Sequence, residues 1–172
     1  ELSGEPLETI HKVCSESSNY LEEIKEASKG LDIVTASVGF DPFNKVFEIP
    51  KNPKERYKIM NEEMPKGGEL SLDMMYRTCG IQINYDYTSE KNFEKIFRIG
   101  NYLVPLTIGL FANSPFKERK PSGYLSYRSK VWQQTSRGGI MPIAFEKMTF
   151  EKYFDFIKDY PILFAIRDKN YI

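Results

Sequence analysis

The sequence has few cysteines, a single histidine and no net charge. Its two cysteines, Cys14 and Cys79, are too few for a disulfide framework and lack the spacing of a metal site. We expect both to be buried thiols in a reducing compartment. The 24 Lys and Arg residues balance 24 Asp and Glu residues, so no basic field would attract nucleic acid or an anionic membrane. Neither is therefore an expected partner.

Two longer motifs are also missing. No apolar run approaches the roughly 18 residues that a membrane-spanning helix needs. The chain has no Gly-x-x-x-x-Gly-Lys loop, and the pair Gly138-Gly139 is too weak a signal for a phosphate-binding loop. A P-loop kinase or ATPase is therefore excluded.

The residues that are present predict a mixed α+β fold. With 172 residues, of which 41% are hydrophobic, the chain can bury one sizeable core, so a single domain is the default. Apolar spacing predicts helices over about 6–27, 55–63, 93–111 and 150–159, the third of them a buried core helix kinked at Pro105. Strands are predicted over 33–39, 78–87 and 162–166. The strands and helices do not alternate regularly, which favours α+β over a doubly wound fold.

The predicted strand from Thr78 to Tyr87 carries the most specific pattern. Apolar and thiol side chains alternate strictly with polar ones, and the polar face consists of Thr78, Gly80, Gln82, Asn84 and Asp86. A period of two indicates a half-buried strand. The amide-rich face favours a polar-ligand site, and the alternative is an ordinary solvent-exposed face.

Four motifs follow one another from this strand onward: Met74-Met75-Tyr76-Arg77-Thr78-Cys79, Gln82-Ile83-Asn84-Tyr85-Asp86, Phe111-Ala112-Asn113-Ser114-Pro115-Phe116 and Tyr124-Leu125-Ser126-Tyr127-Arg128-Ser129. In this order, and with Trp132, they resemble the plant and proteobacterial type of glutamate-cysteine ligase, or γ-glutamylcysteine synthetase. Shorter matches from Glu1 to Tyr160 extend the resemblance over nearly the whole chain.

The resemblance implies a fold and a reaction. The fold is like that of glutamine synthetase, with an antiparallel sheet and packed helices. The reaction uses ATP and Mg²⁺ to join the γ-carboxylate of glutamate to the amino group of cysteine through a γ-glutamyl phosphate, the first step of glutathione biosynthesis. Glutamate, cysteine and ATP are the expected small-molecule partners, and the oligomeric state stays open. The expected compartment is the bacterial cytoplasm, or the plastid if the source is a plant.

The resemblance also assigns site residues. Arg128 is the first candidate, as a catalytic and substrate-binding residue, because a planar guanidinium can grip a carboxylate or phosphate through two parallel hydrogen bonds. Gln82 and Asn84 are expected to bind substrate or complete a metal shell through neutral oxygens, and a purely structural hydrogen-bonding role is the alternative. Glu1 stands where related ligases place a magnesium ligand.

Four further residues are second-rank substrate-binding candidates. Arg77 and Thr78 begin the predicted strand, and Tyr127 and Trp132 are candidates for the wall of the amino-acid pocket. For the two aromatic residues, a position in the core is the alternative.

Parts of the family pattern are missing from these 172 residues, including a Glu-x-Glu strand for magnesium. We therefore expect the chain to be a single domain or the central portion of a larger catalytic domain, inactive by itself. Two alternatives remain open. One is a related carboxylate-amine ligase with another amine substrate, and the other is a non-catalytic relative that binds an amino acid.

Overall fold

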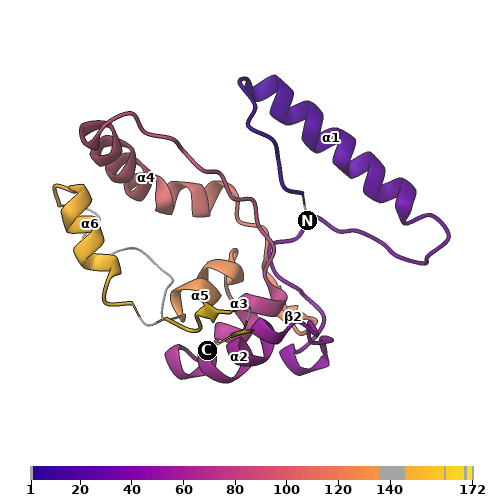
Figure 1. The fold of residues 1–172 in the computed structure, drawn as a ribbon. Helices are drawn as coiled ribbons and strands as arrows, with labels where there is room; N and C mark the ends of the chain where they lie inside the picture. Colours follow the sequence, from indigo (N-terminus) through magenta and orange to yellow (C-terminus); the bar gives the residue numbers. More distant parts are fainter. Residues whose placement is uncertain (1, 136–145, 161, 169, 172) are drawn as a thin grey trace. The chain divides into compact units, whose positions relative to one another are not determined.

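The computed structural model describes residues 2–135, 146–160, 162–168 and 170–171, and the chain divides into two units, Glu1–Ser37 and Val38–Ile172. The first unit contains helix α1 (Ile10–Ala27), which Figure 1 shows as a continuous helix. The side chain of Thr9 accepts a hydrogen bond from the Lys12 N–H, which satisfies one of the free donors at the start of the helix. The predicted first helix is confirmed.

The second unit contains most of the regular structure. Its described α-helices are α2 (Glu55–Glu63), α3 (Ser71–Arg77), α4 (Glu90–Leu110), α5 (Tyr127–Gln133) and α6 (Phe150–Ile157), and its described 3₁₀ helices are η1 (Val46–Glu48) and η2 (Met64–Gly67). Hydroxyl side chains cap three of the helices: Ser89 before α4, Ser126 before α5 and Thr149 before α6. The predicted helices that correspond to α2, α4 and α6 are confirmed.

The described strands are short and form two antiparallel pairs. Strand β1 (Phe116–Lys117) pairs with β2 (Lys120–Pro121), and β3 (Ile166–Arg167) pairs with β4 (Asn170–Tyr171). The α+β class is therefore confirmed, with small two-stranded sheets. The strand predicted over 162–166 reaches regular pairing only at its last residue. Residues 33–39, predicted as another strand, form no described strand.

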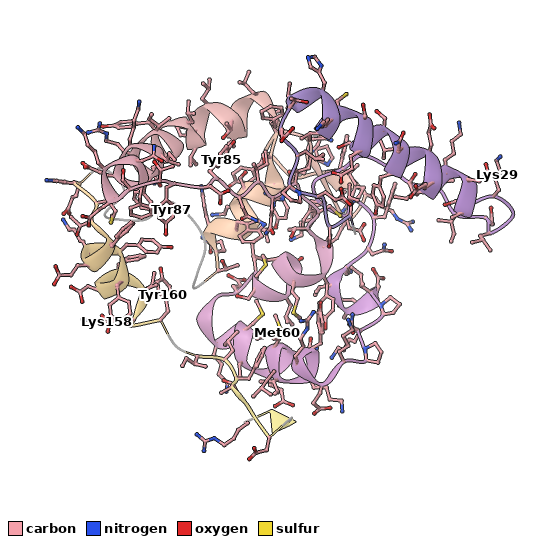
Figure 2. The ribbon with its side chains drawn as sticks, turned by 45° about the horizontal axis from the view of Figure 1, so that its top comes forward. Lys29, Met60, Tyr85, Tyr87, Lys158 and Tyr160 are labelled. Carbon is pink, nitrogen blue, oxygen red and sulfur yellow. The ribbon has the colours of Figure 1, made fainter. Side chains whose placement is uncertain are left out.

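The predicted strand from Thr78 to Tyr87 is wrong in this structure. Thr78 makes an isolated bridge with Phe40, and residues 79–87 are exposed and lie outside any regular element. Tyr85 and Tyr87 lie on this segment (Figure 2). The period-two pattern specifies which side chains share a face, whereas a strand also needs a neighbouring backbone as hydrogen-bond partner. The described residues supply that partner only at the start of the segment.

The core of the second unit forms around α3 and α5. Phe40, Tyr127 and Val131 are buried together, and Leu70 and Met74 pack against them. The rings of Phe40 and Tyr127 meet edge to face, with centroids 5.0 Å apart. Such pairs stabilise a fold by about 0.5–1.5 kcal/mol beyond the contribution of the area that they bury. This cluster holds the start of α5 against the residues that follow Gly39.

Helix α4 is less buried than its sequence predicts. Aromatic side chains at its start pack against α6, with Phe93 5.3 Å from Phe150 and 5.7 Å from Tyr153 between ring centroids. Nevertheless, no residue of α4 is fully buried, so the prediction of a buried core helix is wrong. The apolar stripe runs the length of the helix, whereas α6 contacts only its first turns. Among the described residues, no helix combines the length and the apolar character that crossing a membrane requires.

Candidate functional site

Four segments of the second unit meet beside Arg128. The Gly39 N–H donates to the Asn113 carbonyl at 3.0 Å, and the Cys79 N–H donates to the Gly39 carbonyl at 3.1 Å. Ser114 forms a parallel bridge with Ser126, the residue that caps α5. Residues far apart in the sequence are therefore joined by backbone hydrogen bonds, which place the first turn of α5 at their meeting point.

Arg128 is held at both its backbone and its side chain. Its N–H donates to the hydroxyl of buried Ser114 at 3.1 Å, and its Nε donates to the carbonyl of Cys79 at 2.7 Å. The guanidinium also lies over the Trp132 ring, with Cζ 5.3 Å from the centroid. A cation over an aromatic face gains about 0.5–2 kcal/mol, depending on its exposure to water. The side chain is therefore positioned before any ligand arrives.

The two Nη atoms of Arg128 make no hydrogen bond or ion pair within the part of the chain that the structure describes. Because Nε already donates to the Cys79 carbonyl, the two Nη atoms are the donors that remain for a ligand. Burial lowers the pKa of Arg128 from its usual value, and the nearby Cys79 thiol partly opposes this effect. Arginine nevertheless stays protonated in proteins. The arrangement suits a bidentate grip on a carboxylate or a phosphate.

Gly80 leaves the space that the guanidinium uses. A Cβ atom built on Gly80 would lie 2.6 Å from Nη2 of Arg128 and 3.2 Å from its Cζ. Any larger residue would therefore push the end of the side chain away from its present position. Sequence analysis placed Gly80 on a polar face and gave it no role.

Tyr127 and Trp132 differ in their surroundings. Tyr127 is 8% exposed and belongs to the core cluster with Phe40, so the alternative of a core position describes it better. Trp132 is half-buried under Arg128, and its buried Nε1 has no hydrogen-bond partner among the described residues. Trp132 therefore belongs to the surroundings of the Arg128 guanidinium, whereas Tyr127 belongs to the core cluster.

Arg77 lies in a different environment from Arg128. It ends helix α3 rather than beginning a strand, and it is 3% exposed. One Nη atom binds the Asp73 carboxylate at 2.7 Å, the other donates to the Asp41 carbonyl at 3.2 Å, and the guanidinium stacks 4.3 Å from the Phe40 ring centroid. These contacts occupy Arg77 within the protein. Its predicted substrate-binding role remains untested.

The amide candidates are not brought to Arg128. Gln82 and Asn84 are exposed on the segment 79–87, and no described contact connects them to the guanidinium. Thr78 is half-buried, and its hydroxyl donates to the Met74 carbonyl at 2.6 Å, a bond that continues the end of α3. The substrate-binding roles of these three residues stay predictions.

The predicted metal ligand, Glu1, lies outside the described residues. Within residues 2–135, 146–160, 162–168 and 170–171, no group of three or more His, Cys, Asp or Glu side chains could hold a metal ion. The described residues therefore do not make a magnesium site by themselves.

Sequence analysis missed two partners of Arg128, the Cys79 carbonyl and the Ser114 hydroxyl. The Asn113-Ser114-Pro115 motif was the only signal for Ser114, and a backbone carbonyl leaves no signal in a sequence. Cys79 and Cys14 were expected to be buried, but both are exposed. Cys79 begins the exposed segment 79–87, and Cys14 lies on a helix with no buried residue.

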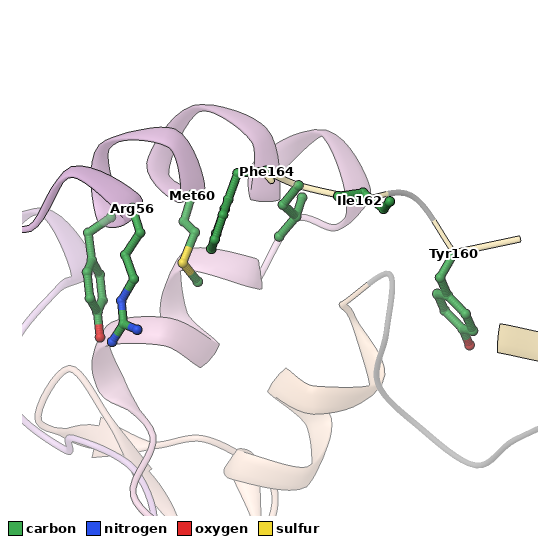
Figure 3. A pocket seen from close by; sticks show the side chains of 7 residues that line it. Arg56, Met60, Tyr160, Ile162 and Phe164 are labelled. Carbon is green, nitrogen blue, oxygen red and sulfur yellow. The ribbon is translucent and has the colours of Figure 1, made fainter. Parts of the chain in front are cut away.

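Another hollow in the second unit is lined by α2, Tyr160 and residues 162–164. It has a volume of about 530 Å³, and Figure 3 shows Arg56 and Met60 of α2 facing it, with Phe164 beside Met60. Arg56 supplies the charged group of the lining, and its guanidinium lies 5.1 Å from the Tyr57 ring centroid. The apolar lining gives this hollow fewer polar groups for a charged substrate than the surroundings of Arg128.

The family model and the related proteins point to the same family. The model of glutamate-cysteine ligase family 2 matches residues 1–172. Glutamate–cysteine ligase A of Oryza sativa subsp. japonica is 46% identical over 175 residues, which cover all of this chain and 36% of that protein. The ligases of Nicotiana tabacum and Arabidopsis thaliana are 46% and 45% identical, again over the whole chain and 34% of each relative. All three relatives carry the description chloroplastic. The chain spans about a third of the length of these relatives.

Proposed function

We propose that this chain, which belongs to glutamate-cysteine ligase family 2, is part of an ATP-dependent ligase that joins L-glutamate to L-cysteine. The relatives that match the whole chain are named for this reaction, at 45–46% identity. The product is γ-glutamylcysteine, which places the enzyme at the first step of glutathione biosynthesis. For the complete protein we propose the glutamine-synthetase-like fold, since the described unit contributes helices and only short sheets.

The reaction has two steps. A carboxylate is a poor electrophile, so ATP transfers its γ-phosphoryl group to the γ-carboxylate of glutamate and leaves as ADP. The amine of cysteine then attacks the acyl phosphate, phosphate leaves, and the amine loses a proton. Both steps develop negative charge on oxygen atoms that a positioned cation stabilises.

Within this chain, the proposal rests on the contacts that position Arg128. Its Nε is anchored by Cys79, its face is covered by Trp132, and its two Nη atoms have no hydrogen-bond partner among the described residues. This arrangement would hold a carboxylate of the amino-acid substrate or an oxygen pair of the transferred phosphoryl group. Because the guanidinium is already oriented, little reorganisation is required when the charge develops.

Magnesium is part of the proposal only for the whole protein. Mg²⁺ prefers carboxylate and water oxygens in octahedral geometry, and the described residues offer no cluster of such side chains. The described residues therefore contribute no cluster of metal ligands to either step. The role of Glu1 as a ligand remains a proposal that rests on the resemblance alone.

The compartment is also proposed from relatives. The names of the three compared proteins say chloroplastic, which favours the plastid alternative over the bacterial cytoplasm.

The decisive experiment follows product formation by the full-length protein. ATP, glutamate and cysteine should give γ-glutamylcysteine, ADP and phosphate in equal amounts, and the reaction should stop when a chelator removes Mg²⁺. A parallel reaction with 2-aminobutyrate, which lacks the thiol, tests the choice of amine. If 2-aminobutyrate is used much better than cysteine, the enzyme is a ligase for another amine. If a folded protein forms no product with any amine, the ligase proposal is wrong and a non-catalytic relative replaces it.

A further inference from the structure

A second group of cations surrounds a groove next to the hairpin of β1 and β2. The groove has a volume of about 640 Å³ and is lined by Lys45, Lys117, Lys120, Ser122, Tyr127 and by Glu118 and Pro121. Three lysines and one glutamate therefore contribute to its lining. Sequence analysis assigned no role to any of the three lysines.

Backbone hydrogen bonds hold the hairpin that carries Lys117 and Lys120. Glu118 and Arg119 form its tight turn, with φ of 50° and 66°, and the Arg119 N–H donates to the Pro42 carbonyl at 2.8 Å. At the open end, the Ser122 N–H donates to the Pro115 carbonyl at 2.8 Å. The two ends of the hairpin are therefore tied to the backbone that surrounds the groove.

Lys117 and Lys120 stand directly opposite each other in the register of the two strands. Like charges at directly opposed positions destabilise an antiparallel pair. Glu118 offsets this repulsion only partly, because its carboxylate lies 3.9 Å from Lys117 Nζ and is shared with Arg77 Nη1 at 3.7 Å. An anion in the groove would remove the remaining repulsion.

The ammonium groups stay available to such an anion. Lys117 Nζ lies 5.3 Å from the Tyr127 ring centroid, and a hydrogen bond with Tyr127 raises the pKa of Lys117, so its charge is secure. Lys45 Nζ lies 5.7 Å from the Phe47 ring centroid, while Glu48 accepts from the Lys45 backbone N–H. The acidic neighbour Asp73 is bound to Arg77. Within the described residues, Lys45 and Lys120 have no ion pair.

We propose that this groove binds a phosphate group that carries two or more negative charges. Several lysines around a hollow act as point charges, which suits a tetrahedral phosphate. The fork of Arg128, by contrast, suits a planar carboxylate as well as it suits a phosphate. The groove is a site separate from Arg128, because Tyr127 faces it while the next residue of α5 projects about 100° away around the helix. The proposal stands whether or not the protein is a ligase.

The first test titrates the full-length protein with pyrophosphate in the absence of Mg²⁺ and measures binding by calorimetry. Lys117→Ala combined with Lys120→Ala should weaken binding by about tenfold or more, since each change removes a charged hydrogen-bond donor. The matched control is Lys91→Ala combined with Lys95→Ala, which removes two exposed lysines of α4 and should leave the affinity unchanged.

A second test uses thermal unfolding. Without an anion, Lys120→Ala should raise the melting temperature, because it removes the opposed charge. Pyrophosphate should raise the melting temperature of the unmodified protein more than that of this variant. The proposal is overturned if pyrophosphate does not bind, or if the control pair weakens binding as much as the groove pair.

Repeating the titration with ATP and with adenosine identifies the source of the phosphate. If ATP binding is lost in the groove variant, and adenosine competes with ATP, the ligand is a nucleotide. If only pyrophosphate binding is lost, the ligand is an inorganic phosphate. Both results support the shared chemistry.

Discussion

The Nε atom of Arg128 donates to the carbonyl of Cys79 at 2.7 Å, across 49 positions of sequence. This bond turns the guanidinium so that its two Nη atoms form the edge left for a ligand. The same contact explains why Gly80 follows Cys79, since the guanidinium occupies the place of a Cβ atom there.

Replacing Arg128 by lysine should keep the charge and remove the fork. Lysine has one ammonium group, which cannot donate two parallel hydrogen bonds to one carboxylate. We expect kcat/KM of the full-length ligase to fall by about 10²–10³-fold, the usual effect of losing one positioned donor of a developing oxyanion. Steady-state kinetics with glutamate and ATP varied in turn measures it. An unchanged kcat/KM would remove Arg128 from the site.

Replacing Gly80 by alanine should displace the guanidinium without unfolding the protein. The new Cβ would meet Nη2 at 2.6 Å, and this atom lies at the end of a flexible side chain that can move. We expect a fall in kcat/KM with a nearly unchanged melting temperature. Gly100→Ala is the matched control, because nothing lies within 4 Å of a Cβ there. In the interior of α4 that change should stabilise the protein by about 0.5–1 kcal/mol and leave activity intact.

Replacing Arg77 by alanine should destabilise the second unit severely. Its side chain is 1% exposed and is bound to Asp73 at 2.7 Å, so the variant leaves a carboxylate without its cation. Breaking a buried ion pair costs about 3–5 kcal/mol. Urea denaturation measures the free energy of unfolding. Arg98→Ala, at an exposed position of α4, should change it by less than about 0.5 kcal/mol; an equal loss in both variants would contradict the role of the buried pair.

Asp41 should make stability depend on pH in the acid range. Burial raises its pKa, but hydrogen bonds from the Asn44 side chain and from the Phe43 and Asn44 N–H groups, with the charge of Arg77, lower it below the ordinary 3.8. A carboxyl group with a lowered pKa stabilises the folded state above the unfolded-state value, and this contribution is lost as the pH falls through the folded-state value.

The corresponding variant is Asp41→Asn. It should be less stable than the unmodified protein at neutral pH, and the difference should shrink as the pH falls below 3.8. Denaturation curves collected from neutral to acid pH measure it. Asp86→Asn, on the exposed segment 79–87, should leave stability unchanged over the same range. A constant difference for Asp41→Asn at every pH would contradict this origin.

The helices were largely predictable from the sequence because their hydrogen bonds are local. Each backbone N–H in an α-helix reaches a carbonyl four residues earlier, and caps such as Thr9 and Ser89 lie within the same short segment. Apolar spacing and hydroxyl residues therefore carry enough information to predict α1, α2, α4 and α6. The resemblance also predicted the family, which the family model confirms over residues 1–172.

The strand over 78–87 was not predictable in the same way. Alternation specifies its two faces, but its backbone hydrogen bonds depend on residues far away in the sequence. The Phe40 bridge to Thr78 is the described pairing of that kind. The amide face of Gln82 and Asn84 was therefore assigned to a sheet that the described residues do not build.

By itself, the sequence determined the family, the α+β class and the positions of the main helices, because motifs and local hydrogen bonds are written in consecutive residues. Only the tertiary structure shows how differently the two arginines of those motifs are surrounded. Arg77 is enclosed by Asp73, Phe40 and the Asp41 carbonyl, while Arg128 keeps its Nη atoms available beside Gly80. Their surroundings come from segments distant in sequence, and the burial of a charge depends on what folds around it.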